Sequence, residues 1–291
     1  MLHALEKTDP NTIKSRTETM KCQTLCNEIH VAEKWFCACR DGESYVCCSC
    51  EDPPERKVGH KLHVTKAMFP CAQARPRRLR SGAWWGGKVG MWPVGCCRPA
   101  ARTPKNRVAG AQLFEPESID GDKRRHVLMD LVVPAMLTTT PDCECNKRQQ
   151  TVIQQGGAPS HVAPRDAEWT QRLTDMGLEE KMELVTQPAS SPDLSVSDLG
   201  FFNALQSMRC CATPTNAVQL TEMVEETCKQ CPINKVNRMW LTLQTVFNSA
   251  LKDCGGNDCS ATHMGKEKLE KAGRLPRALA VDPMAEHFLN D

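Results

Sequence analysis

Tyrosine is almost missing from this chain: Tyr45 is the one tyrosine among 291 residues, and aromatic residues make up 5% of the sequence. Long apolar runs are missing as well, since no stretch approaches the roughly 18 apolar residues that a membrane-spanning helix requires. Residues 1–28 are polar and aperiodic, and they contain no apolar core of signal-peptide length. We therefore expect an intracellular protein, not a secreted one, in which residues 1–28 form a tail or linker.

A cysteine framework that would hold zinc or disulfides is also missing, although the chain has 18 cysteines. The pair Cys228-x-x-Cys231 lies near a predicted helix end, with no His-x-x-x-His to supply the remaining zinc ligands. A long chain without a secretion signal is expected to keep its thiols reduced. The cysteines therefore indicate neither a zinc centre nor a secreted disulfide scaffold.

Hydrophobic periodicity predicts a succession of strands and helices. Expected strands cover residues 29–36, 44–50, 60–69, 151–155 and 182–185. Expected helices cover residues 122–137, 165–176, 198–208, 215–230 and 266–272, with a long helix that begins at Pro232. Three antiparallel strands, then alternating helices and strands, then helices predict an α/β fold with a mixed sheet.

Residues 71–110 differ in charge from the rest of the chain, whose net charge is only +2. They contain three tryptophans, no acidic residue and nine basic residues, which are Arg75, Arg77, Arg78, Arg80, Lys88, Arg98, Arg102, Lys105 and Arg107. Basic side chains among aromatics are typical of a nucleic-acid-binding surface, where they neutralise phosphates. The alternative is a solvated insertion whose tryptophans pack on the sheet, and the sequence leaves both interpretations open.

Three short segments resemble the sequence blocks of mariner-like transposases, and they occur in the same order. The segments are His30-Val31-Ala32-Glu33-Lys34-Trp35-Phe36, Gln154-Gln155-Gly156-Gly157-Ala158-Pro159-Ser160-His161 and Ser191-Pro192-Asp193-Leu194-Ser195-Val196-Ser197-Asp198-Leu199-Gly200-Phe201-Phe202. The resemblance extends from about Ile29 to the C-terminus. It implies a ribonuclease-H-like domain over residues 29–210, with a basic insertion at 71–110 and a C-terminal helical extension at 211–291. It also implies DNA cleavage and strand transfer.

The chemistry that the resemblance implies requires three carboxylates holding Mg²⁺ or Mn²⁺. By the family pattern, the first acid follows His30-Val31, the second follows Gln154-Gln155 and the third ends the loop from Ser191. This chain has Ala32, Gly156 and Asp198 at those positions, so Asp198 is the one acid that remains of the three metal ligands. Magnesium prefers oxygen ligands, which neither alanine nor glycine side chains supply. We therefore expect an inactive enzyme that does not bind the metal.

Members of the family usually carry paired helix-turn-helix modules ahead of the catalytic domain, and 28 polar residues are too few to hold them. DNA binding should then be weak and without sequence preference, and the location nuclear or otherwise intracellular. The resemblance also allows a homodimer. Cysteines such as Cys37, Cys210 and Cys211 stand where aromatics are expected in relatives, which fits a decaying element copy.

Two other functions remain open from the sequence. One is a non-catalytic DNA-binding or regulatory protein that kept the transposase fold and acts through its basic residues. The other is an active nuclease that uses displaced acids such as Asp41, Glu43 or Asp120.

Overall fold

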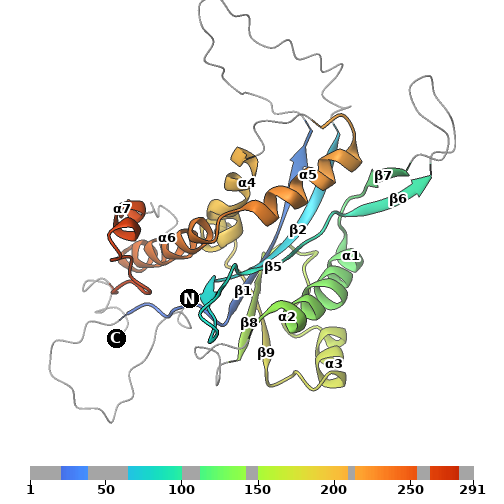
Figure 1. The fold of residues 1–291 in the computed structure, drawn as a ribbon. Coiled ribbons are helices and arrows are strands. Elements are labelled where there is room, and N and C mark those ends of the chain that lie inside the picture. The colour runs from blue at the N-terminus through green and yellow to red at the C-terminus, as the bar shows by residue number, and fades with distance from the viewer. Residues whose placement is uncertain are drawn as a thin grey trace, which may run out of the picture.

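A five-stranded mixed sheet forms the centre of the molecule (Figure 1). The computed structural model describes residues 21–38, 65–99, 112–141, 150–208, 214–253 and 263–281. The strand order is β5-β2-β1-β8-β9. Their bounds are β1 Glu28–Cys37, β2 Lys66–Ala74, β5 Lys88–Met91, β8 Thr151–Gln155 and β9 Met182–Thr186.

Strand β1 lies in the middle of this sheet and is the point where its direction changes. It pairs antiparallel with β2, from Ile29 opposite Ala74 to Cys37 opposite Lys66. On its other side it pairs parallel with β8, which in turn pairs parallel with β9. Parallel strands are usually covered on both faces, which agrees with the mostly buried first half of β1.

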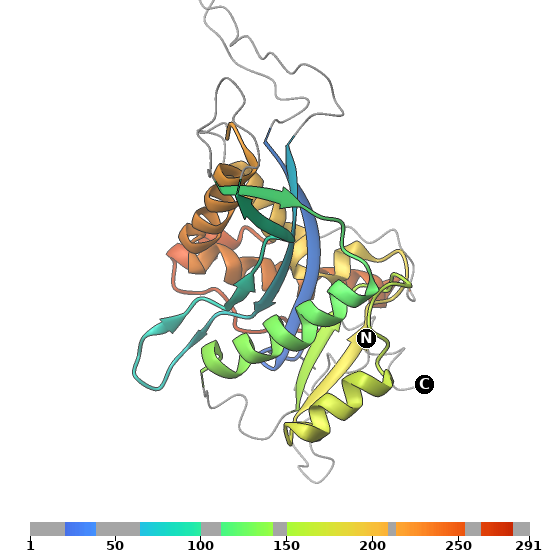
Figure 2. The same ribbon diagram turned by 90° about the vertical axis from the view of Figure 1, so that its right-hand side faces the viewer.

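Helices cover both faces of the sheet (Figure 2). One face packs against a continuous helical run and against α3, Ala167–Asp175. The run consists of α1 Gly121–His126, the π-helical segment η3 Val127–Val132 and α2 Val133–Thr139. The other face packs against η6 Ser197–Phe201, α4 Phe202–Met208, α5 Ala217–Gln230 and α6 Ile233–Lys252.

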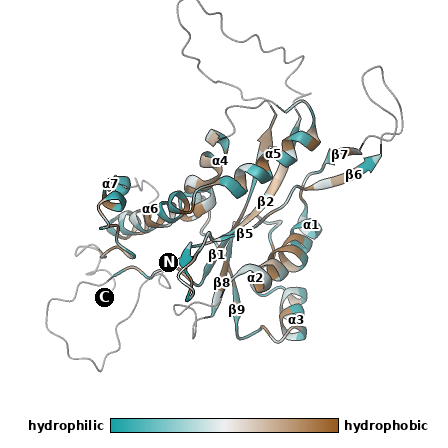
Figure 3. Cartoon of the chain, in the orientation of Figure 1, coloured by the Kyte–Doolittle hydropathy of each residue, from teal (hydrophilic) through white to brown (hydrophobic). Residues whose placement is uncertain are grey.

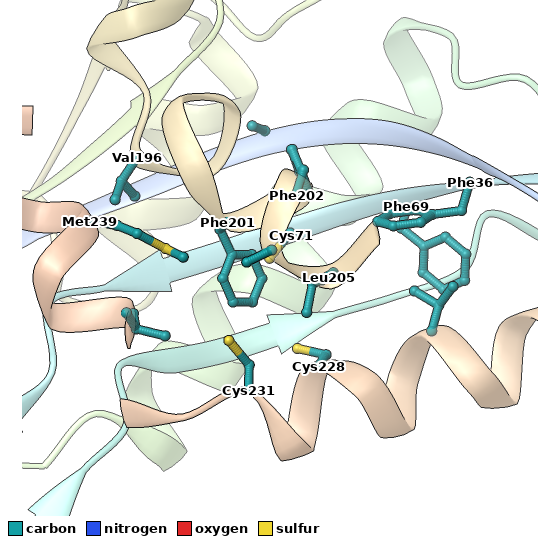
Figure 4. Close-up of a cluster of buried hydrophobic side chains, with 14 of the residues drawn as sticks. Phe36, Phe69, Cys71, Val196, Phe201, Phe202, Leu205, Cys228, Cys231 and Met239 are labelled. Carbon is teal, nitrogen blue, oxygen red and sulfur yellow. The ribbon is translucent and has the colours of Figure 1, made fainter. Parts of the chain in front are cut away.

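Aromatic side chains fill the core on the second face (Figure 4). Phe36 of β1 meets Phe69 of β2 edge-on, with ring centroids 5.5 Å apart, and Phe202 of α4 lies 6.2 Å from Phe36. Trp240 of α6 is fully buried in the same core. Edge-to-face pairs of this kind add to the free energy gained from burial alone. The core therefore fixes α4 and α6 against the middle of the sheet.

Smaller elements extend from this framework. A hairpin of β3 Arg77–Arg78 and β4 Trp84–Trp85 follows β2, and β6 Gly95–Pro99 pairs with β7 Gln112–Pro116. The short helices are η5, Pro192–Leu194, and α7, Lys266–Lys271. Hydropathy follows this layout: β2 is brown in Figure 3, and α7 is mostly teal.

The mixed α/β fold that the sequence predicts is confirmed. Some predicted boundaries differ. The strand expected over 60–69 continues as β2 to Ala74, and the helix expected over 122–137 runs to Thr139. The helix expected over 215–230 begins at Ala217, after an N-cap at Asn216. Within the basic stretch 71–110, residues 71–74 are the end of β2 and residues 88–91 are β5, and both belong to the central sheet. The strand expected over 44–50 lies outside the described residues. No described helix is long and apolar enough to cross a membrane.

Lys88 of β5 joins the sheet to the end of α5. Its ammonium group donates hydrogen bonds to the backbone carbonyls of Cys228, Lys229 and Cys231, at 2.9, 2.6 and 2.9 Å. Helix ends leave carbonyls without intrahelical partners, and a cation there also interacts favourably with the helix dipole. Lys88 is therefore a C-terminal cap supplied from a distant strand.

Replacing Lys88 by methionine keeps the aliphatic stem and removes the donor. We expect Lys88→Met to lower the free energy of unfolding by about 1–3 kcal/mol, because carbonyls that the ammonium satisfied lose a charged donor. Urea unfolding followed by circular dichroism measures this loss. Lys229→Met, at an exposed position of the same helix, is the control. Equal stability of the two variants would show that the cap contributes nothing.

Candidate functional site

The positions of the first two expected acids are brought side by side by strand pairing. Val31 of β1 is level with Gln155 of β8 in the parallel register, so the next residues, Ala32 and Gly156, follow at neighbouring places. Ala32 is 8% exposed and belongs to the core on the α6 side. Neither residue carries a polar side-chain atom, so this part of the site has no ligand or acid.

Two polar side chains, His30 and Gln154, hold the loop that leads to Asp198 near Ala32 and Gly156. The backbone N–H of Val196 donates to Nδ1 of His30, at 3.2 Å, and Nε2 of Gln154 donates to the carbonyl of Leu194, at 2.8 Å. His30 is 1% exposed, and its Nε2 lies 3.3 Å from a carboxylate oxygen of Glu28. Since Nδ1 accepts, Nε2 carries the proton and donates to Glu28. These bonds hold the loop before η6 against β1 and β8.

Asp198 is the carboxylate that this loop delivers, at the first turn of η6. Its side chain remains exposed, yet partial burial raises the pKa of the Asp198 carboxyl above its ordinary value of 3.8. The Ser195 hydroxyl and the charge of Lys34 act in the opposite direction, whereas the charge of Glu33 raises the pKa further. The surroundings of Asp198 thus disfavour the ionised form of its carboxyl group.

A divalent cation does not fit the residues that are present. Among the described residues, no group of three histidine, cysteine, aspartate or glutamate side chains could hold a metal ion. Cys71 of β2 is paired with Ala32 of β1, and it is fully buried beside aromatic side chains (Figure 4). Burial raises the pKa of the Cys71 thiol well above its usual range, and the Asp198 charge adds to this shift, so Cys71 stays protonated.

Glu33 points to the opposite face of β1, as alternation along a strand predicts. There it lies 3.6 Å from Nη1 of Arg124 in α1 and 3.4 Å from Nε2 of His161. Arg124 Nη1 is in turn 2.9 Å from Nδ1 of His161. Glu33 is therefore ion-paired with Arg124 and lies within hydrogen-bonding distance of His161, so it does not take the place of the first expected acid.

The same histidine limits what position 156 can carry. Gly156 has no left-handed backbone, so its φ would accept an aspartate. A Cβ added there would lie 3.1 Å from Cε1 of His161, close enough that the ring must shift by a few tenths of an ångström. A carboxylate at 156 would thus stand beside both His161 and Arg124.

Solved structures with a similar fold are transposase complexes. A Mos1 transposase paired-end complex with the left transposon end and a Mos1 mariner paired-end complex with Mn each match with a TM-score of 0.53 and 15% identity. The chain has the ribonuclease-H-like mariner transposase fold. The matches cover 79% and 80% of this chain but only 56% and 57% of those transposase chains. No protein-family model and no curated protein sequence matches the chain.

The mariner-like fold separates the nine basic candidates into different environments. Arg75 and Arg77 are each 3% exposed, and they donate to the carbonyls of Thr24, Arg277 and Cys26. Lys88 caps α5, and Arg98 lies 3.6 Å from Glu115. Arg78 and Arg80 are exposed. Arg102, Lys105 and Arg107 lie outside the described residues.

Other acids of the mariner-like fold have structural roles. Asp120, one of the displaced acids considered from the sequence, is the N-cap of α1, where Oδ1 accepts from the backbone N–H of Lys123 at 2.9 Å. Asp41 and Glu43 lie outside the described residues. Sequence reasoning did not identify the contacts of Arg124, Glu28 or Lys88, because each joins segments whose proximity no local pattern indicates.

The raised pKa of Asp198 gives a pH-dependent prediction. A folded-state pKa above the unfolded value means that the ionised carboxylate destabilises the fold at neutral pH and ceases to do so as it is protonated. We expect Asp198→Asn to melt at a higher temperature than the parent at pH 7. The difference should shrink as the pH approaches about 4, near the ordinary pKa.

Thermal unfolding of both proteins across this pH range provides the measurement. Asp193→Asn, at an exposed aspartate in the same loop, controls for a general loss of negative charge. A gain for Asp198→Asn that is absent at pH 7, or that grows in acid, would contradict the direction of the shift.

Proposed function

We propose that this chain is a mariner-like transposase catalytic domain that neither cleaves nor joins DNA. The observation that supports this most strongly is the pairing of β1 with β8, in which Val31 is level with Gln155. Ala32 and Gly156 follow these two residues, at the positions where the resemblance requires two acids. In-line phosphoryl transfer by two metal ions needs ligands that hold both ions a few ångströms apart. Asp198 alone cannot hold them, and Glu33 is engaged by Arg124 and His161.

DNA is the partner that we propose, bound weakly and without sequence preference. The structural relatives include complexes with transposon-end DNA. Arg75, Arg77 and Lys88 donate hydrogen bonds to backbone carbonyls of this chain, so they are poor candidates for binding DNA. The candidate DNA-binding surface therefore consists of exposed basic residues, with Arg78 and Arg80 foremost. Such a protein would act in the nucleus, and a homodimer remains part of the same proposal.

A non-catalytic DNA-binding or regulatory role is the second candidate. It is favoured by the integrity of the fold around the lost site, where His30 and Gln154 still hold the loop before Asp198. A degenerate copy and a retained regulator differ in whether the purified chain folds cooperatively. A sharp melting transition supports the second candidate over the decaying copy.

Catalysis itself is tested directly. We expect the purified chain not to nick or join supercoiled DNA in Mg²⁺ or Mn²⁺, because two of three metal ligands are replaced. Asp198→Ala is the matched control. Metal-dependent cleavage by the parent above the level of this variant would show that other residues complete the site.

Restoring the two acids tests the alignment of the site. We expect Ala32→Asp combined with Gly156→Asp to destabilise the chain without metal, because, if the three positions form one site, their carboxylates are gathered together and like charges repel. Mn²⁺ bound to the folded state should reverse the loss, by about 2.7 kcal/mol at a hundredfold excess over Kd. Melting temperatures with and without Mn²⁺ measure both effects.

Two further variants make this measurement decisive. Ala32→Asn combined with Gly156→Asn has nearly the same shape, including the crowding against His161, but supplies no charge and should gain nothing from Mn²⁺. Adding Asp198→Ala to the double aspartate variant should remove most of the gain. If all variants respond to Mn²⁺ alike, then Ala32, Gly156 and Asp198 do not form one site.

A further inference from the structure

A basic pocket lies at the end of the sheet where β1 begins and β2 ends. It has a volume of about 710 Å³ and lies between the β3–β4 hairpin, α6 and the segment that follows α7. Its charged lining consists of Arg75, Arg77, Arg78, Arg80 and Arg277, and no acidic residue is among the described residues that line it. Five guanidinium groups without a carboxylate make a strongly positive hollow, which favours an anion.

The buried arginines act as supports for this pocket. Arg75 bonds three separate segments, through the carbonyls of Thr24 and Arg277 and the side chain of Asn237, at 2.6, 2.7 and 3.4 Å. Burial, together with the charge of Arg277, lowers the pKa of Arg75 to about 10. A bound anion would relieve this unfavourable field. The hydrogen bonds of the buried Arg75 thus fix the segments that line the pocket. The exposed arginines of the pocket can contact a ligand.

The hairpin presents an aromatic ring at the same place. Arg77 is level with Trp85, and its guanidinium lies 4.7 Å from the centre of the Trp85 ring, which anchors one face of the hairpin. Arg78 is level with Trp84, so these two side chains share the opposite face. Trp84 is 55% exposed and lines the pocket. An exposed indole beside exposed arginines joins a stacking surface to phosphate-binding groups.

We propose that this pocket binds a nucleotide unit of single-stranded DNA, with the base stacked on Trp84 and the phosphates held by Arg78, Arg80 and Arg277. The size of the pocket is that of a small-ligand site, which suits one or two unpaired nucleotides better than the broad surface of a duplex. This inference rests on the proposed DNA binding. It adds where the DNA binds, in this pocket, and that the bound DNA is single-stranded.

Fluorescence anisotropy of a labelled twelve-nucleotide oligothymidine, compared with a duplex of equal length, tests the assignment. We expect Trp84→Ala to weaken binding of the single strand roughly ten-fold without changing its salt dependence, because stacking carries no charge. Trp84→Phe keeps an aromatic face and should retain most of the affinity. Arg78→Ala with Arg80→Ala should flatten the salt dependence by roughly 0.7 in log-log slope for each phosphate that is no longer neutralised.

A control variant removes two positive charges outside the pocket, as many as Arg78→Ala with Arg80→Ala removes within it. Arg172→Ala with Lys181→Ala changes exposed positions in α3 and just before β9, and it should leave both affinity and slope near the parent values. Melting curves of every variant establish that each is folded.

The possible results separate the pocket from DNA binding in general. If the chain binds neither single strand nor duplex, the proposed DNA binding fails and the pocket assignment fails with it. If it binds but no pocket variant differs from the Arg172 and Lys181 control, DNA binding stands and the pocket is wrong. Tighter pocket-dependent binding of the duplex would overturn the single-strand assignment. Displacement by millimolar inorganic phosphate, with Trp84→Ala unchanged, would reduce the pocket to an anion site and overturn base stacking.

Discussion

The pairing of β1 on both of its edges is the constraint on which the rest of the structure depends. Its antiparallel partner β2 and its parallel partner β8 fix its register, and a shift by one residue would exchange its two buried faces. The same register makes Ala32 and Gly156 neighbours and presents His30 to the loop before η6. One strand therefore organises the core, the sheet topology and the geometry of the candidate site.

Periodicity predicted most of this framework from the sequence. Strands β8 and β9 and helices α3, α5 and α6 agree with the expected ranges within a few residues, because each has an apolar stripe of the right period. The π-helical segment η3 and the cap by Lys88 were not predictable. Lys88 contacts a helix end about 140 residues away, and side-chain contacts across such separations leave no local pattern.

The surroundings of the candidate site could not be predicted from the sequence. Sequence resemblance identified Ala32, Gly156 and Asp198, but the cluster of Glu33, Arg124 and His161 joins three distant segments. From composition alone, the arginines of residues 71–110 could not be told apart. The fold divides them, because Arg75 lies where β2 leaves the sheet and bonds backbone carbonyls, whereas Arg78 lies on the outward face of a hairpin. Burial, which composition does not contain, decides which arginine can meet a ligand.

The residues at the three expected acid positions also affect the electrostatics of the fold itself. Carboxylates gathered to hold cations repel one another when no cation is bound, so such a site lowers stability for the sake of function. In this chain Ala32 instead extends the apolar core, and Gly156 carries no charge beside His161. The arginine that neutralises Glu33 is fixed in α1 and needs no exchangeable ion. Asp198, with its pKa raised by burial, is the remaining unfavourable acid among the three positions. The fold at these positions therefore needs no bound cation to offset the repulsion of gathered carboxylates.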